Sequence, residues 1–156
     1  MCVSPTPEQL VQTAMTLAAE AGKRGDPPFG ALLVSPHGEV VAMASNRQVS
    51  AADPTAHAEM ELLRGAARAG APPSLRGYTV AVNAEPCSMC ASALVKAEVG
   101  KLLYGAPHEP HMDPDIDVAA VFGHARRPPE VIPGILAAEA AAQIATFRSA
   151  GGEPVD

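Results

Sequence analysis

The sequence predicts an α/β fold, a three-layer α/β/α sandwich around a central mixed sheet. Two short apolar runs, at residues 31–34 and 40–44, flank a turn at Ser35–Gly38 and predict a β-hairpin. After the hairpin, segments of helical period alternate with further short apolar runs, which is typical of layered α/β proteins. With 156 residues, 47% of them hydrophobic, the chain can bury one core. We therefore expect a single domain over residues 1–156, with its core at about 6–149 and a flexible tail at 150–156.

The first helix is predicted to begin at Thr6, which suits the N-cap position. Pro7 fits the first helical position, and Gln9 completes a capping-box pattern. Apolar side chains then recur at helical spacing as far as Ala21, and the segment Gly22–Pro28 is expected to end the helix.

The rest of the chain alternates between predicted helices and predicted strands. We expect helices over about 56–69, 87–98 and 134–148, and strands over 78–83 and 102–105. The stretch 107–133 is dense in Pro, His and Asp, and it predicts only a short helix at 118–124. No internal repeat or linker interrupts this order.

Charge and cysteine content narrow the class of partner and the compartment. Acidic residues number 17 against 11 basic ones, and the formal charge of −6 argues against a nucleic-acid partner, which needs a surface that neutralises phosphates. No apolar stretch is long enough for a membrane span, and the start lacks the features of a secretory signal. The 3 cysteines cannot form a closed disulfide framework. These features predict a cytoplasmic protein whose Cys87 and Cys90 are metal ligands or a redox pair.

His57, Cys87 and Cys90 form a candidate zinc site. Cys87 and Cys90 are three residues apart at a predicted helix start, so both sulfurs point the same way, and His57 lies at the start of the preceding helix. Three protein ligands leave the fourth zinc position open to water, as in catalytic sites. Both helix N-termini would favour thiolates and a bound anion. Glu59 is too far around the helix to ligate the same ion, and we expect it to take the water's proton and deliver it to the substrate.

The order His57-Ala58-Glu59 followed by Pro86-Cys87-Ser88-Met89-Cys90 resembles the signature of the zinc-dependent cytidine/deoxycytidylate deaminase superfamily. Further segments are similar to the branch that contains guanine deaminases and tRNA adenosine deaminases, and the resemblance covers about residues 8–106. These segments are Pro28–Ala31, Ser45–Arg47, Asp53–Glu59 and Glu85–Cys90. The resemblance implies a cytidine-deaminase-like sandwich that binds one Zn²⁺ per chain.

The resemblance also implies substrate contacts and a partner. It implies that Asn46 contacts the base, that the Ala58 N–H holds a ring carbonyl and that Phe29 lines the pocket. Glu85 is a further substrate-binding candidate, and Asp115 and Asp117 are candidates in an acidic lid. Asn46 could instead be a simple turn residue, and Phe29 could be core packing. The branch forms homodimers in which each chain completes its partner's pocket, so we expect a homodimer.

The expected activity is hydrolytic deamination of a small aminated heterocycle, with guanine as the leading substrate. Phe29 resembles the free-base enzymes, and the chain does not end in basic residues. Residues 134–139 resemble the tRNA enzymes, which keeps a tRNA-specific adenosine deaminase or a nucleoside deaminase as the alternative. Two other classes remain open, a non-catalytic protein with a closed zinc site and a redox protein that uses Cys87 and Cys90.

Overall fold

The computed structural model describes residues 3–150, so Cys2 and most of the predicted tail lie outside the described residues. Its sheet has five strands in the order β2-β1-β3-β4-β5. β1 runs antiparallel to β2 and β3, whereas β3, β4 and β5 are mutually parallel, which confirms the mixed sheet. The strands are β1 (Gly30–Val34), β2 (Val40–Ser45), β3 (Thr79–Ala84), β4 (Lys101–Ala106) and β5 (Glu130–Ile132).

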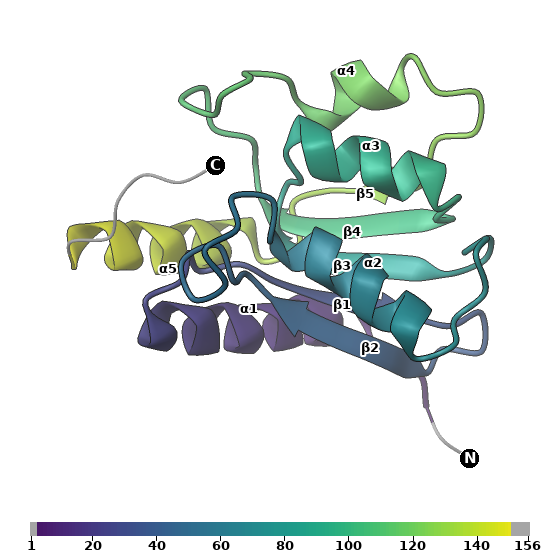
Figure 1. Ribbon diagram of the computed structural model, residues 1–156, viewed down its shortest axis with the longest axis horizontal. Helices are drawn as coiled ribbons and strands as arrows, with labels where there is room; N and C mark the ends of the chain where they lie inside the picture. Colours follow the sequence, from purple (N-terminus) through teal and green to yellow (C-terminus); the bar gives the residue numbers. More distant parts are fainter. Residues whose placement is uncertain (1–2, 151–156) are drawn as a thin grey trace.

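Helices cover both faces of this sheet, as Figure 1 shows, and the predicted three-layer sandwich is confirmed. α1 (Pro7–Arg24) and α5 (Ala137–Ser149) pack on one face, and α2 (Ala58–Arg68) packs on the other with α3 (Ser88–Lys96). The short helix α4 (Val118–Phe122) lies against α3. The apolar side chains of the sheet therefore divide into one core on each face, with Leu33 and Val80 on the α2 side and Leu32 and Ala81 on the α1 side.

The first helix begins as predicted, and it ends within the segment Gly22–Pro28, as expected. Thr6 accepts the Gln9 N–H and donates its own backbone N–H to the Gln9 side chain, so the capping box is present. The helix continues through Gly22, which lies against the Phe147 ring of α5. The helix ends at Gly25, whose φ of 91° is a left-handed conformation that glycine adopts without strain.

The region after residue 106 differs most from the prediction. β5 was not predicted, because its three residues are too few to show an alternating pattern, and its place is set by parallel pairing with β4. The short helix predicted at 118–124 is present as α4. The last helix begins at Ala137, after Leu136 in a left-handed conformation, rather than at residue 134.

Close packing of α1 against the sheet depends on Gly30, the first residue of β1. A side chain at this position would collide with the Ala14 carbonyl oxygen and with Leu17. Next to it, the fully buried Asn83 of β3 accepts the Gly30 N–H and donates to the Pro28 carbonyl. These contacts fix the segment that carries Phe29 onto the end of the sheet.

No helix within residues 3–150 combines the length and the apolar character that a membrane span requires.

Candidate metal centre and the adjoining cavity

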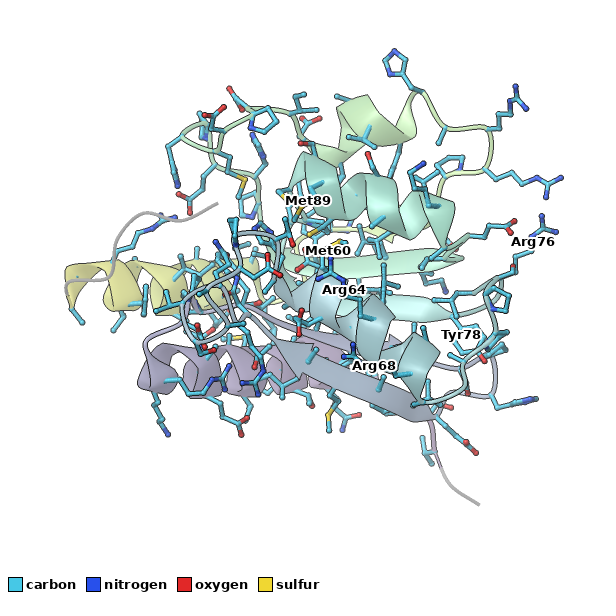
Figure 2. The ribbon with its side chains drawn as sticks, viewed as in Figure 1. Met60, Arg64, Arg68, Arg76, Tyr78 and Met89 are labelled. Carbon is cyan, nitrogen blue, oxygen red and sulfur yellow. The ribbon has the colours of Figure 1, made fainter. Side chains whose placement is uncertain are left out.

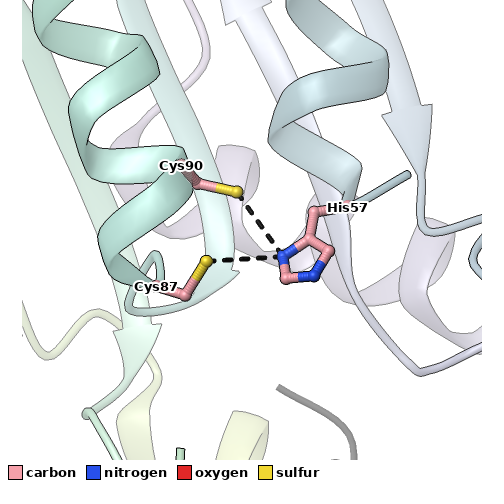
Figure 3. A group of neighbouring side chains, drawn as sticks. All are labelled: His57, Cys87 and Cys90. Carbon is pink, nitrogen blue, oxygen red and sulfur yellow. Dashed lines mark hydrogen bonds between the residues drawn. The ribbon is translucent and has the colours of Figure 1, made fainter. Parts of the chain in front are cut away.

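Two of the three predicted zinc ligands occupy the N-cap positions of neighbouring helices. His57 precedes α2 and Cys87 precedes α3, both with extended backbone, and neither side chain caps its own helix. N-cap positions usually hold Ser, Thr, Asp or Asn, whose oxygens accept from the first turn. Here these positions hold metal-binding side chains that point away from their helices toward each other. Cys90 joins them from the first turn of α3 (Figure 3).

The three donor atoms are spaced as a zinc ion requires. The His57 Nδ1 atom lies 3.5 Å from the Cys87 Sγ and 3.5 Å from the Cys90 Sγ. All three donors lie within 4.8 Å of one another. Zinc bonds of about 2.0–2.1 Å to nitrogen and about 2.3 Å to sulfur at a tetrahedral angle separate N and S by about 3.6 Å. The donor set therefore fits zinc, with three ligands from this chain.

The electrostatic setting favours a thiolate at Cys87. A hydrogen bond from the Cys90 thiol outweighs the effect of burial and, helped by His57, lowers the pKa of Cys87 to about 4. The same bond and burial raise the pKa of Cys90. The N-terminus of α3 adds a positive potential at both sulfurs. Cys87 therefore offers the anionic form that a metal binds.

Glu59 lies in the first turn of α2, buried to 5% exposure, and lines the same cavity as His57 and Cys87. Burial raises the pKa of its carboxyl group to about 6, although the nearby His57 acts in the opposite direction. A carboxyl group with a pKa closer to neutrality can both accept and return a proton. Glu59 therefore has the place and the acidity of a general acid–base group.

Four of the predicted substrate-binding residues lie around this cavity. Phe29, Asn46, Ala58 and Glu85 all line it. Met112, which no sequence pattern predicts as a site residue, completes the lining from the segment after β4 and is 9% exposed. No local pattern marks Met112, because its position depends on how residues 107–117 fold back over the sheet.

Asp115 and Asp117 do not line the cavity. Asp117 is the N-cap of α4, where its side chain accepts the Ala120 N–H at 2.8 Å. Asp115 accepts from the His108 Nε2 atom at 2.6 Å on the exposed surface. Both carboxylates therefore organise the segment that covers the cavity.

Glu85 attaches this segment to the sheet. One of its carboxylate oxygens accepts the His108 N–H at 3.2 Å and the other accepts the Val118 N–H at 3.1 Å. Tyr104 also bonds to Glu85, and burial together with this bond raises the pKa of the tyrosine hydroxyl. Glu85 thus holds both ends of residues 108–118, and Met112 lies between them.

A second buried carboxylate, Asp26, holds the loop that carries Asn46. It is 0% exposed, and it accepts the Val49 and Ser50 N–H groups, the Ser50 hydroxyl and the Arg24 Nε–H. Arg24 in turn donates to the Asn46 carbonyl at 3.0 Å. Burial alone would raise the pKa of Asp26, but the bonds from Ser50, Arg24 and Val49 outweigh it and the pKa is lowered.

We expect Asp26→Ala to lower the free energy of unfolding by about 1–3 kcal/mol, because it leaves two backbone N–H groups without their acceptor and removes the carboxylate that the partly exposed Arg24 contacts. The matched control is Arg76→Ala, which removes the exposed ion pair with Glu98 and should cost about 0–1 kcal/mol. Because the folded-state pKa of Asp26 is lowered, its contribution is present above the unfolded value of about 3.9 and is lost as the pH falls below it. Denaturant unfolding at neutral and acidic pH measures both effects. Equal losses in the two variants would contradict the assignment.

The fold and the three-ligand centre define a class, the zinc-binding deaminase-type α/β sandwich. Residues 4–106 match the sequence model of the family described as the cytidine and deoxycytidylate deaminase zinc-binding region. The match includes His57, Glu59, Cys87 and Cys90. The chain belongs to this family.

Curated relatives carry two kinds of name. A "tRNA-specific adenosine deaminase" of Agrobacterium fabrum is 41% identical over 62% of this chain and 62% of its own length. A protein of the same name from Aquifex aeolicus is 36% identical over 67% of this chain and 68% of its own. A "tRNA(Ile)-lysidine synthase" of Deinococcus radiodurans is 39% identical over 60% of this chain but only 16% of its own length. The matches thus span less than two thirds of the first and third of these proteins.

Solved structures share the fold over most of the chain. A structure from work on A-to-I editing by tRNA:A34 deaminases has a TM-score of 0.77 and 33% identity, covering 86% of this chain and 97% of its own. A guanine deaminase of Nitrosomonas europaea has a TM-score of 0.77 and 22% identity, covering 95% and 87%. The latter identity supports likeness of fold alone.

Proposed function

We propose that the protein is a zinc-dependent hydrolytic deaminase that replaces the exocyclic amine of an aminated heterocycle by oxygen and releases ammonia. The observation that carries this proposal is the buried Glu59, which shares one cavity with His57 and Cys87. A purely structural zinc site does not require a buried carboxyl group with a raised pKa beside it. A redox pair of cysteines does not require His57. Both features suit hydrolysis.

Residues in and beside the cavity divide the tasks of this reaction. His57, Cys87 and Cys90 would hold the zinc, which when bound supplies Lewis-acid activation of water. Glu59 takes a proton from the attacking water and passes it to a ring nitrogen, and it then takes the remaining proton of the added hydroxyl and delivers it to the departing amine. Ala58 is the first residue of α2, where the backbone N–H has no partner within its own helix and can bind a ring acceptor. Phe29 provides an apolar wall for a flat ring.

A free base such as guanine, or a related aminated heterocycle, is the substrate that the chain's own properties favour. The formal charge of −6 gives no long-range attraction to a polyanion. The segment that contributes Met112 to the cavity lining also contains three aspartates, at 113, 115 and 117. Phosphate groups would be repelled there, whereas a neutral base would not.

A tRNA adenosine is the second candidate, and the relatives favour it. Those at 36% and 41% identity have the name tRNA-specific adenosine deaminase. The structure adds that Arg64 and Arg68 project from the outer side of α2 (Figure 2), one helical turn apart. Two such cations could contact consecutive phosphates of an RNA strand.

Ammonia release from guanine, adenosine and a tRNA anticodon stem–loop, each at low and high salt, distinguishes the candidates. We expect release from the free base with little dependence on salt, and slow reaction of the stem–loop. Strong reaction of the stem–loop that falls steeply with salt, together with inert free bases, would instead establish the tRNA substrate. Zinc-loaded protein that releases no ammonia from any of the three would contradict the proposed activity.

We further propose a homodimer, as the family resemblance implies. Met60 of α2 and Met89 of α3 are only half-buried and lie on the outer side of these helices (Figure 2). An apolar surface next to the cavity suits a contact with a second copy. Light scattering at micromolar concentration measures the mass, and a monomer there would contradict the dimer.

A further inference from the structure

The backbone around Asn46 is held in place by hydrogen bonds at the wall of the cavity. Asn46 is 1% exposed, its backbone N–H donates to the Phe29 carbonyl at 2.9 Å, and its own carbonyl accepts from Arg24. Beyond it, Asp26 binds the Val49 and Ser50 N–H groups. The backbone on both sides of Asn46 is therefore fixed before any ligand is considered.

Gln48 determines the orientation of the Asn46 side-chain amide. The backbone N–H of Gln48 lies 2.8 Å from one amide atom of Asn46. Because this N–H can only donate, that atom must be the oxygen Oδ1. The other amide atom, Nδ2, then lies 2.5 Å from the side-chain oxygen of Gln48 and donates to it. The two contacts reinforce each other, since reversing the Asn46 amide alone, with Gln48 unchanged, would break both.

This arrangement leaves one N–H of Asn46 Nδ2 for the cavity. An amide nitrogen carries two hydrogens, of which Gln48 uses one. We propose that Gln48 is a positioning residue that makes Asn46 a hydrogen-bond donor toward the substrate. The heterocycle then presents an acceptor to Asn46, either a ring nitrogen without hydrogen or a carbonyl oxygen. This inference rests on the proposed function, but the orientation of the amide can be tested without it.

Two variants of Gln48 distinguish between the two possible orientations of the Asn46 amide. Gln48→Met has a similar length but no acceptor, so Asn46 Nδ2 loses its partner. Gln48→Glu keeps an acceptor at the same distance along the side chain and should behave as the wild type. If the amide were oriented the other way, Gln48 would be the donor, and the carboxylate of Gln48→Glu would repel the Asn46 oxygen. Gln12→Met is the matched control, because Gln12 is exposed on α1.

The first measurement is heteronuclear NMR of the labelled proteins without substrate. We expect the Asn46 side-chain N–H₂ signals to be well separated and protected from exchange in the wild type, in Gln48→Glu and in the control. In Gln48→Met the two signals should converge and lose their protection from exchange. Unchanged Asn46 signals in Gln48→Met, or equal loss of protection in Gln48→Glu, would overturn the inference.

The second measurement is steady-state ammonia release from guanine, and from the anticodon stem–loop if guanine is inert. Gln48→Met should raise KM by about fivefold to tenfold with kcat within about threefold, because a ground-state hydrogen bond is lost. Gln48→Glu should restore KM. A fall in kcat alone would contradict the positioning role. If the zinc-loaded wild type releases no ammonia from either probe, the proposed function fails while the NMR result still decides the orientation.

Discussion

Glu59→Gln should lower kcat by a factor of about 100 or more while the protein keeps its zinc. The amide has the size of the carboxyl group and can still form hydrogen bonds, but it cannot accept a proton from water and return it. Because Glu59 is not among the three residues that fit the metal, the zinc content should stay unchanged. Ammonia release and metal analysis on the same preparation measure both quantities.

The matched control for this variant is Glu61→Gln. Glu61 lies two residues further along α2, is partly exposed and pairs with Arg64 at 3.4 Å, and it is not among the residues that line the cavity. Its replacement should leave kcat within about twofold, as expected for an exposed pair of little energetic weight. Turnover of Glu59→Gln within a few-fold of the wild type would rule out the general acid–base role.

Cys90→Ala should remove the zinc and lower the thermal stability. Cys90 is fully buried, and its sulfur is one of the three donors that residues 3–150 bring together, so the remaining pair cannot complete a zinc site. If free zinc exceeds its dissociation constant about 1,000-fold, its binding contributes about 4 kcal/mol, and loss of this term should lower Tm by about 10 °C. Metal analysis after dialysis and thermal unfolding with and without added zinc measure the effect.

Ser92→Ala provides the comparison on the same helix, because Ser92 lies two residues beyond Cys90 on α3 and is only half-buried. It should keep the zinc and the wild-type Tm. Cys87→Ala should behave as Cys90→Ala does, since both sulfurs lie 3.5 Å from the His57 Nδ1 atom. Full zinc retention in both cysteine variants would show that these residues do not bind the metal.

The features that could be predicted from the sequence are those that depend on residues close together in the chain. The capping box at Thr6, the hairpin and the helix–strand alternation depend on neighbours within a few residues, and the structure confirms them. The three donors could be grouped because Cys87 and Cys90 share one turn and His57 starts a helix on the same side of the sheet.

The parts that could not be predicted depend on contacts between distant residues. β5 exists because β4 offers it a parallel neighbour, not because three residues favour a strand. Met112 reaches the cavity because Glu85, more than twenty positions earlier, holds the segment around it. Likewise, Asp26 is an unremarkable acidic residue in the sequence, and only the fold shows that it is buried under the Asn46 loop.

The attachment through Glu85 has a consequence for how proteins of this kind can diversify. The part of the chain that matches the family ends at residue 106, yet one wall of the cavity is built by Met112, from the stretch that follows. Glu85, beside the metal-binding turn, holds that stretch mainly by accepting backbone N–H groups, which any amino acid at 108 or 118 other than proline could supply. The side chains of this stretch can therefore be exchanged over generations while its path over the cavity is kept. A lineage can in this way acquire a new substrate and inherit the reaction centre unchanged.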